Sequence, residues 1–197
     1  MKRSLFYLFI IAGIAGLLYF FSEQEDGIQP VELGEHGKIS SLSLVNQKGE
    51  PFNLENMRDK ILVINFFFTS CQGPCPIMSQ KMAELQESFV NASEVNLISI
   101  TVDPDTDSPE VLLQYAENYH ALPDKWSFLT GDEANIVAFA QDQLKVGMGE
   151  HADLHSTKLI LIDQKMTIRG YYDSHNDKDM TKLKKDVQRL RHNPPLS

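Results

Sequence analysis

Apolar and polar positions alternate along much of the chain in the patterns of short strands. The clearest is residues 61–68, a nearly continuous apolar run interrupted by Asn65, which is typical of a strand buried on both faces. Residues 42–54 alternate around a turn at Gly49 and predict a small opening hairpin. Residues 126–129 form either a short strand or a loop. Three further runs have the length and composition of strands: residues 95–102, 158–162 and 167–172.

Between these runs, apolar residues recur every three or four positions and predict amphipathic helices. One helix begins near Pro76, since proline suits a first helical turn, and another begins with Ser108 as its N-cap and Pro109 as its first residue. Two more cover residues 136–144 and 180–190. Strands that alternate with helices predict an α/β fold, a central mixed β-sheet flanked by helices on both faces.

The N-terminus has the pattern of a membrane anchor. Lys2 and Arg3 precede an apolar run at residues 5–21, and about 17 to 25 such residues span a bilayer. A cleaved secretory signal is the alternative, but bulky residues stand where a cleavage site requires small ones. The positive charges before the run predict a cytoplasmic N-terminus. We expect a single transmembrane helix in the bacterial cytoplasmic membrane, with the remaining chain on the periplasmic side.

Composition fits one folded domain behind that anchor. The chain has 197 residues, of which 42% are hydrophobic, enough for one ordinary core. Its formal charge of -9 argues against nucleic acid as a partner, because phosphate binding requires clustered Lys and Arg. The predicted organisation is an anchor at residues 1–22, a tether at 23–38, a domain at 39–192 and a tail at 193–197.

The chain has two cysteines, Cys71 and Cys75, between a buried strand and the first turn of a helix. The N–H groups and dipole of a helix N-terminus stabilise a thiolate, the form that attacks disulfides and binds metals. A purely structural disulfide closing so short a loop would contribute only about 2 kcal/mol. A redox or metal role is therefore favoured over a structural disulfide.

Two soft thiolates need a third ligand to form a selective copper site, and histidine suits that metal. Among the six histidines, His155 lies in the loop that enters the strand at 158–162. Loops at such strand edges converge on the site in α/β folds. His151 and Met148 in the same loop are weaker candidates.

Four phrases of the sequence carry a resemblance to a known family. They are NFFFTSCQGPCPIM at 65–78, SITVDPDTDSP at 99–109, Trp126 with FLTG at 128–131, and DLHSTKLILID at 153–163. From about residue 39 to 190 the chain resembles the Sco (SenC) proteins. Members of this family are membrane-tethered, thioredoxin-fold proteins that handle copper for the dinuclear copper centre of cytochrome c oxidase.

The resemblance implies that Cys71, Cys75 and His155 bind one copper ion, and that the cysteines alternate between dithiol and disulfide. The family usually has proline and an acidic residue after the first cysteine, where this chain has Gln72 and Gly73. That departure bears on the partner and on the redox potential.

Two acidic residues, Asp103 and Asp107, match family positions near the site. Each also has an ordinary structural explanation, since Asp103 precedes a proline in a turn and Asp107 stands beside a helix cap. A role in supporting the metal ligands and a purely local role therefore both remain open.

Two related kinds of protein differ from this sequence at defined positions. Thioredoxins separate their cysteines by two residues and place a cis-proline beside them, whereas this chain has a spacing of three and no proline between Pro123 and Pro194. Copper-centre domains of the oxidase have a histidine four residues after the second cysteine, where this chain has Ser79, and their fold is all-β.

Three functions follow from these features. The first is a copper-binding assembly factor that passes copper, electrons or both to the copper-bearing oxidase subunit or to another copper or thiol client. The second is a metal-independent thiol–disulfide oxidoreductase that reduces partner cysteines outside the cytoplasm, and the third is a redox or copper sensor. Only His155 separates the first two, because thiol–disulfide exchange requires two thiols and no imidazole.

Overall fold

The computed structural model describes residues 33–146 and 157–193, and within them the chain forms one mixed sheet. Its strand order is β2-β1-β5-β4-β3-β6-β7, with β3, β4 and β5 parallel and the other pairs antiparallel. The opening hairpin, β1 with β2, and every other predicted strand are confirmed. The bounds are β1 (Ser43–Asn46), β2 (Pro51–Asn53), β3 (Ile61–Phe67), β4 (Val95–Thr101), β5 (Trp126–Thr130), β6 (Lys158–Ile162) and β7 (Ile168–Asp173).

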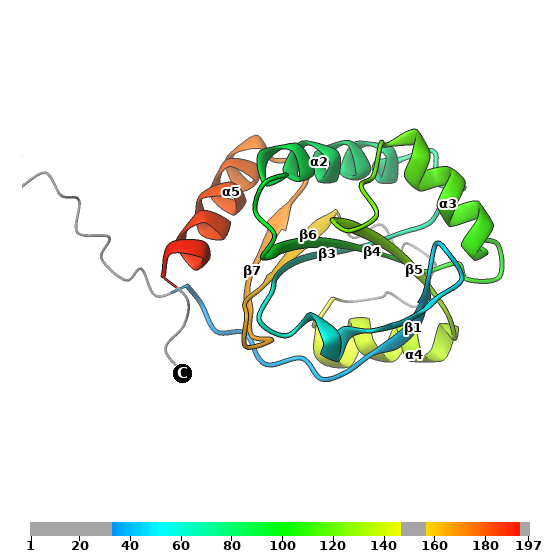
Figure 1. The fold of residues 1–197 in the computed structure, drawn as a ribbon, viewed down its shortest axis with the longest axis horizontal. Helices are drawn as coiled ribbons and strands as arrows, with labels where there is room; N and C mark the ends of the chain where they lie inside the picture. The colour runs from blue at the N-terminus through cyan, green and yellow to red at the C-terminus, as the bar shows by residue number, and fades with distance from the viewer. Residues whose placement is uncertain (1–32, 147–156, 194–197) are drawn as a thin grey trace, which may run out of the picture. The chain divides into compact units, whose positions relative to one another are not determined.

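Helices cover both faces of this sheet, with α2, α3 and α5 on one face and α4 on the other (Figure 1). This arrangement confirms the predicted α/β architecture. The helical segments are η1 (Leu54–Met57, a 3-10 turn), α2 (Pro74–Ser88), α3 (Pro109–Asn118), α4 (Glu133–Ala138), η2 (Phe139–Gln143, a π-helical turn) and α5 (Asp177–His192).

Burial on both faces explains the apolar sequence of β3. All seven of its residues are buried, and they alternate between the core under α2 and the core over α4. Asn65 is accommodated because its Oδ1 accepts a hydrogen bond of 2.6 Å from Ser99 Oγ, which accepts one of 2.9 Å from Trp126 Nε1. The polar residue in the strand is thus joined to a chain of buried hydrogen bonds.

Three helix starts differ from the prediction, and one is that of α5, which begins at Asp177 with Asn176 as its cap rather than at residue 180. Helix α2 begins at Pro74 rather than near Pro76, because Gly73 ends the loop in a non-helical conformation and a proline is tolerated anywhere in the first turn. The helix predicted at 136–144 begins earlier, since Asp132 caps it through a hydrogen bond from the N–H of Asn135. Helix α3 begins as predicted, capped by Ser108.

Parallel strands give the domain two distinct ends. Strands β3 and β4 finish together at Phe67 and Thr101, and we call this end the cysteine edge because Cys71 follows β3. At the opposite end β6 turns into β7 through residues 163–167.

The described chain starts at this opposite end, which we call the tether edge. The N–H of His36 donates to the carbonyl of Ile168 at 3.0 Å, and Lys38 forms a bridge with Thr167. Arg169 donates both to the carbonyl of Leu33, at 3.3 Å, and to the buried carboxylate of Asp163, at 2.7 Å. The last residues of the predicted tether are therefore fastened to β7.

Among residues 33–146 and 157–193, no helix has both the length and the apolar character needed to cross a bilayer. The predicted anchor at residues 1–22 lies outside these ranges, as do most of the predicted tether and residues 194–197 of the predicted tail.

Candidate functional site

The two cysteines lie together at the cysteine edge. Cys71 is in the loop that leaves β3, where its N–H donates to the carbonyl of Phe68 at 3.3 Å. Cys75 is in the first turn of α2, one residue after Pro74. Both are buried and both are free thiols, and they lie close enough to interact, since Cys71 is one cause of the raised pKa of Cys75. Such a pair can close a disulfide by losing two electrons and two protons, or it can offer two soft ligands to a metal.

Burial changes the acidity expected of this pair. A position in the first turn of a helix predicts a stabilised thiolate, yet the pKa of Cys75 rises to about 12. The largest cause is desolvation, because the side chain is only 2% exposed, and the hydrogen bond with Cys71 adds to it. The negative charge of Asp107 acts in the same direction. In the reduced domain Cys75 is therefore held as the thiol.

We expect Cys75 in the reduced, metal-free domain to be alkylated by iodoacetamide at pH 8 on the order of a thousandfold more slowly than in the unfolded chain. A pKa above the assay pH leaves little thiolate, and the rate should increase as the pH is raised toward 12. Mass spectrometry of timed samples measures the rate, and the same chain in urea is the control. Equal rates in the two conditions would contradict this assignment.

A buried carboxylate braces the loop that carries Cys71. Asp107 is fully buried and accepts hydrogen bonds from the N–H of Thr69 at 3.1 Å, from the hydroxyl of Thr69 and from the hydroxyl of Thr101. The last β4 residue and the loop after β3 are thereby tied to one side chain. Charged acceptors make strong hydrogen bonds in a buried setting, so this contact fixes the loop two residues before Cys71.

The structure shows different roles for the two acidic candidates, Asp103 and Asp107. Asp103 takes part through its backbone, since its N–H donates to Thr101 Oγ1 at 3.0 Å and its carbonyl accepts from the N–H of Asp107 at 2.9 Å. That matches its ordinary explanation as a turn residue. Asp107, by contrast, is not merely the neighbour of the Ser108 cap, because its carboxylate faces the cysteine loop.

Ser79 takes a structural role one turn further along α2. It is buried, and its hydroxyl shares a hydrogen bond of 2.9 Å with Tyr115 of α3, whose ring packs 5.1 Å from that of Phe67. Burial also raises the pKa of Tyr115. This contact holds the start of α2 against α3 behind Cys75.

His155 lies outside the described residues, together with His151 and Met148. The chain that follows it is described and lies at the cysteine edge. Strand β6 starts at Lys158 beside β3, with Ile160 opposite Ile64. The carbonyl of Thr157, two residues after His155, accepts a hydrogen bond of 2.9 Å from the N–H of Ser174.

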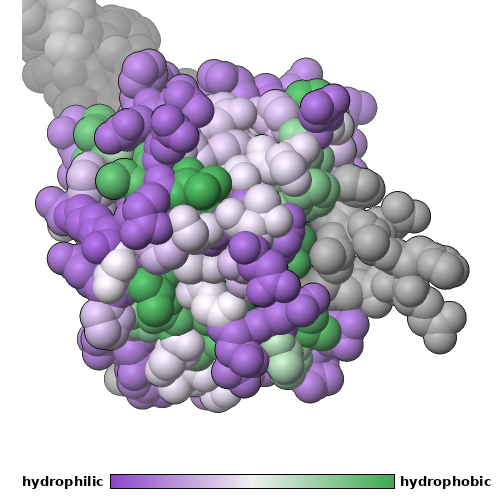
Figure 2. Space-filling model, turned by 90° about the vertical axis from the view of Figure 1, so that its right-hand side faces the viewer, coloured by the Kyte–Doolittle hydropathy of each residue, from purple (hydrophilic) through white to green (hydrophobic). Residues whose placement is uncertain are grey.

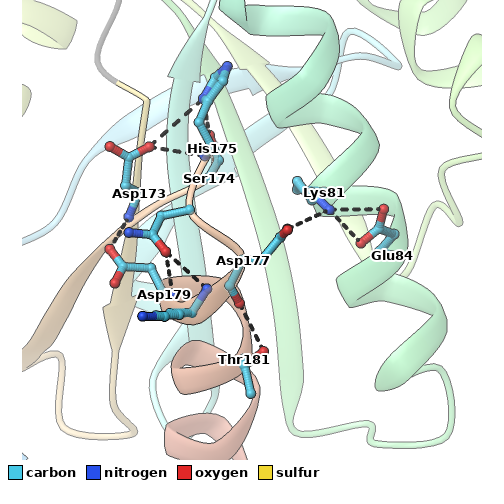
Figure 3. A network of polar contacts seen from close by, with 10 residues as sticks. Lys81, Glu84, Asp173, Ser174, His175, Asp177, Asp179 and Thr181 are labelled. Carbon is cyan, nitrogen blue, oxygen red and sulfur yellow. Dashed lines mark hydrogen bonds and ion pairs between the residues drawn. The ribbon is translucent and has the colours of Figure 1, made fainter.

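The polar network around the start of α5 holds this neighbouring segment (Figure 3). Asp173 pairs with Lys158 at 3.7 Å and accepts from the N–H of His175 at 3.0 Å, while its own N–H donates to Asp179 at 2.9 Å. His175 stays within this network, with its Nδ1 at 3.2 Å from Ser174 Oγ. Within the described ranges, no three His, Cys, Asp or Glu side chains gather closely enough to hold a metal ion.

Comparison with known proteins gives a consistent result. The SCO1/SenC family matches residues 33–191. The SCO1 protein homolog of Bacillus subtilis is 31% identical over 160 residues, covering 78% of this chain and 82% of that protein. A putative copper-binding protein of Stutzerimonas stutzeri is 25% identical over 182 residues, covering 87% and 86%.

A solved structure has the same fold. BsSco, described as a member of the Sco family of cytochrome c oxidase assembly proteins with a disulfide switch, superimposes with a TM-score of 0.71 at 25% identity. The match covers 81% of this chain and 96% of that structure.

Proposed function

The chain belongs to the SCO1/SenC family, and from that membership we propose that it binds one copper ion through Cys71, Cys75 and His155. In this role it assists assembly of the copper centre of cytochrome c oxidase, and the client is the copper-bearing oxidase subunit or another copper or thiol protein. The placement of both free thiols in one buried cluster at the cysteine edge carries the proposal, because it offers two soft sulfur donors to one ion.

The donor set suits copper, since thiolate and imidazole are the side chains that favour Cu(I) over hard cations. Cys71 reaches the site from the loop after β3 and Cys75 from the first turn of α2. His155 would reach it from the loop before β6, the strand next to β3. Ligation requires each thiol to release its proton, so the buried Cys75 proton has to leave as the metal enters.

A membrane tether completes the proposal. The apolar run at residues 5–21 would anchor the chain in the cytoplasmic membrane, with the domain on the periplasmic side, where oxidised and reduced cysteines both persist. Such a tether keeps the domain near a membrane-embedded client and raises the effective concentration of one for the other.

A metal-independent thiol–disulfide oxidoreductase is the second candidate. The disulfide switch described for BsSco favours it, because that relative changes the state of its cysteines. Here the same two thiols would give two electrons and two protons to a partner disulfide and close a disulfide themselves.

Copper titration of the reduced fragment 24–197 tests the first function against the second. We expect the fragment to bind one Cu(I) per chain, and Cys71→Ser or Cys75→Ser to lose that binding, as a competing Cu(I) indicator measures. A fragment that binds no copper yet reduces a model disulfide would reject the metallochaperone and support the oxidoreductase.

A further inference from the structure

A pocket of about 400 Å³ lies far from the cysteines, between the end of α2 and the second half of α5. Six residues line it: Ser88, Phe89, Lys184, Lys185, Gln188 and Arg189. Three of these side chains are cationic and none is acidic. The pocket is thus lined by positive charge and hydrogen-bond donors, together with one phenylalanine.

The positive charge of this pocket is largely unused within the fold. Neither Lys184 nor Lys185 makes a side-chain hydrogen bond or ion pair in the part of the chain that the structure describes. Arg189 uses one nitrogen to donate to Asp186 at 2.6 Å. That buried carboxylate also accepts from Lys182 at 2.6 Å and from Tyr172 at 2.7 Å, so it is already compensated.

The pocket lies at the tether edge. Helix α2 ends there, at Ser88, and the next two residues lead toward the start of β4. The end of α5 is fixed there as well, since Gln164 donates to the carbonyl of Leu190 at 3.1 Å and Arg191 pairs with Glu94 at 2.5 Å. Figure 1 shows the described chain beginning on the same side of the domain as the end of α5.

We propose that this pocket binds the phosphate-bearing headgroup of an anionic phospholipid, with Lys184, Lys185 and Arg189 on the phosphate. The proposal rests on the membrane tether proposed above, since residues 33–39 would bring this edge of the domain close to the bilayer. The half-exposed Val90, next to Phe89 in the chain, supplies apolar surface to the acyl region. Lipid bound here turns the cysteine edge away from the membrane.

Charge complementarity favours a lipid over an apolar protein partner. Basic residues near an anionic surface add to its attraction for a protein, whereas a chain of net charge -9 as a whole is repelled by it. On the face that carries α3 and β1, apolar residues are separate spots among hydrophilic residues (Figure 2). Over the described chain as a whole, the large exposed apolar residues are Ile77, Val90, Val111, Leu113 and Leu122.

Vesicle sedimentation of the fragment 24–197 tests the site, because every described helix and strand lies within that fragment. The probes are vesicles of phosphatidylcholine alone and vesicles containing phosphatidylglycerol. We expect binding only to the second kind, and we expect K184Q with K185Q to weaken it at least about tenfold. Added salt should weaken it too.

The matched control is K81Q with K178Q, which removes two charges from the same two helices outside the pocket, at the middle of α2 and the start of α5. Lys81 pairs there with Glu84 and Asp177 (Figure 3). This control should bind vesicles as the unaltered fragment does. Equal loss in both double variants would show general charge attraction and overturn the site.

Inorganic phosphate separates a lipid site from a small-anion site. If millimolar phosphate displaced the fragment from vesicles completely, the pocket would be a site for free phosphate and the lipid proposal would fail. Copper titration of the same variants keeps the two proposals apart, since Lys184 and Lys185 are remote from the cysteines and their replacement should leave copper binding unchanged.

Discussion

Replacing His155 by alanine is expected to lower the affinity of the reduced protein for Cu(I) by more than about a hundredfold, since even residues that only support metal ligands cost 10–100-fold. The variant leaves two thiolates at the site and removes the nitrogen donor that would complete a trigonal set. The thiol pair itself lies in a buried cluster to which β3, α2 and α3 contribute. Competition with a Cu(I) indicator of known affinity measures the effect.

His151→Ala and His175→Ala are the matched controls. His151 tests the same loop, and His175 tests the network at the start of α5, where it hydrogen-bonds with Ser174. Both should bind copper as the unaltered protein does. His155→Ala should also keep its rate of exchange with a model disulfide, which needs the thiols alone. Unchanged copper affinity in His155→Ala would reject the three-ligand site, and a loss in His151→Ala of equal size would move the third ligand to that residue.

Replacing Asp107 by alanine should destabilise the domain by about 3 kcal/mol, because three donors lose their acceptor in a fully buried place. The same change releases the loop before Cys71, so copper affinity should fall roughly 10–100-fold in molecules that remain folded. Urea unfolding measures the first effect. Copper competition at a temperature where the variant is folded measures the second.

Two comparisons make this prediction specific. Asp103→Ala should change both quantities little, because Asp103 contributes through its backbone. Asp107→Asn keeps one oxygen acceptor. Its stability and its copper affinity should therefore lie between those of Asp107→Ala and those of the unaltered protein. If Asp107→Ala lost stability yet bound copper normally, Asp107 would be a structural residue only, without a part in positioning Cys71.

Much of the fold was predictable because its signals are local. Residues 61–68 have the uninterrupted apolar character of a strand with a core on each face, and β3 is buried at every position. The cap at Ser108 and the turn at Gly49 work through their nearest neighbours in sequence. The placement of Cys71 and Cys75 at a strand end and a helix start followed from the same signals.

What the sequence did not predict depends on distant contacts. Asp107 meets Thr69 across 38 positions, and no periodicity links the two. Its position beside a helix cap already explained the residue locally, so the contact with Thr69 was not predicted. The raised pKa of Cys75 has a similar origin, since a helix start predicts a thiolate while the burial that opposes it comes from packing by other elements. Lys184 and Lys185 lie in a predicted helix, but no local pattern indicates that the end of α2 lies beside them.

The pairing of residues 36–39 with residues 166–168, at the start of β7, bears on how the protein behaves at high concentration. An uncovered outer strand is a template for strands of other molecules, and the chain folds back across the start of β7, at Ile168. At the other margin, β2 is only three residues long and begins with Pro51, which has no N–H to donate. The start of β7 and the short β2 are thus less open to self-association, so a shortened fragment that starts after Ile39 would expose the start of β7 and aggregate more readily than one that keeps residues 33–39.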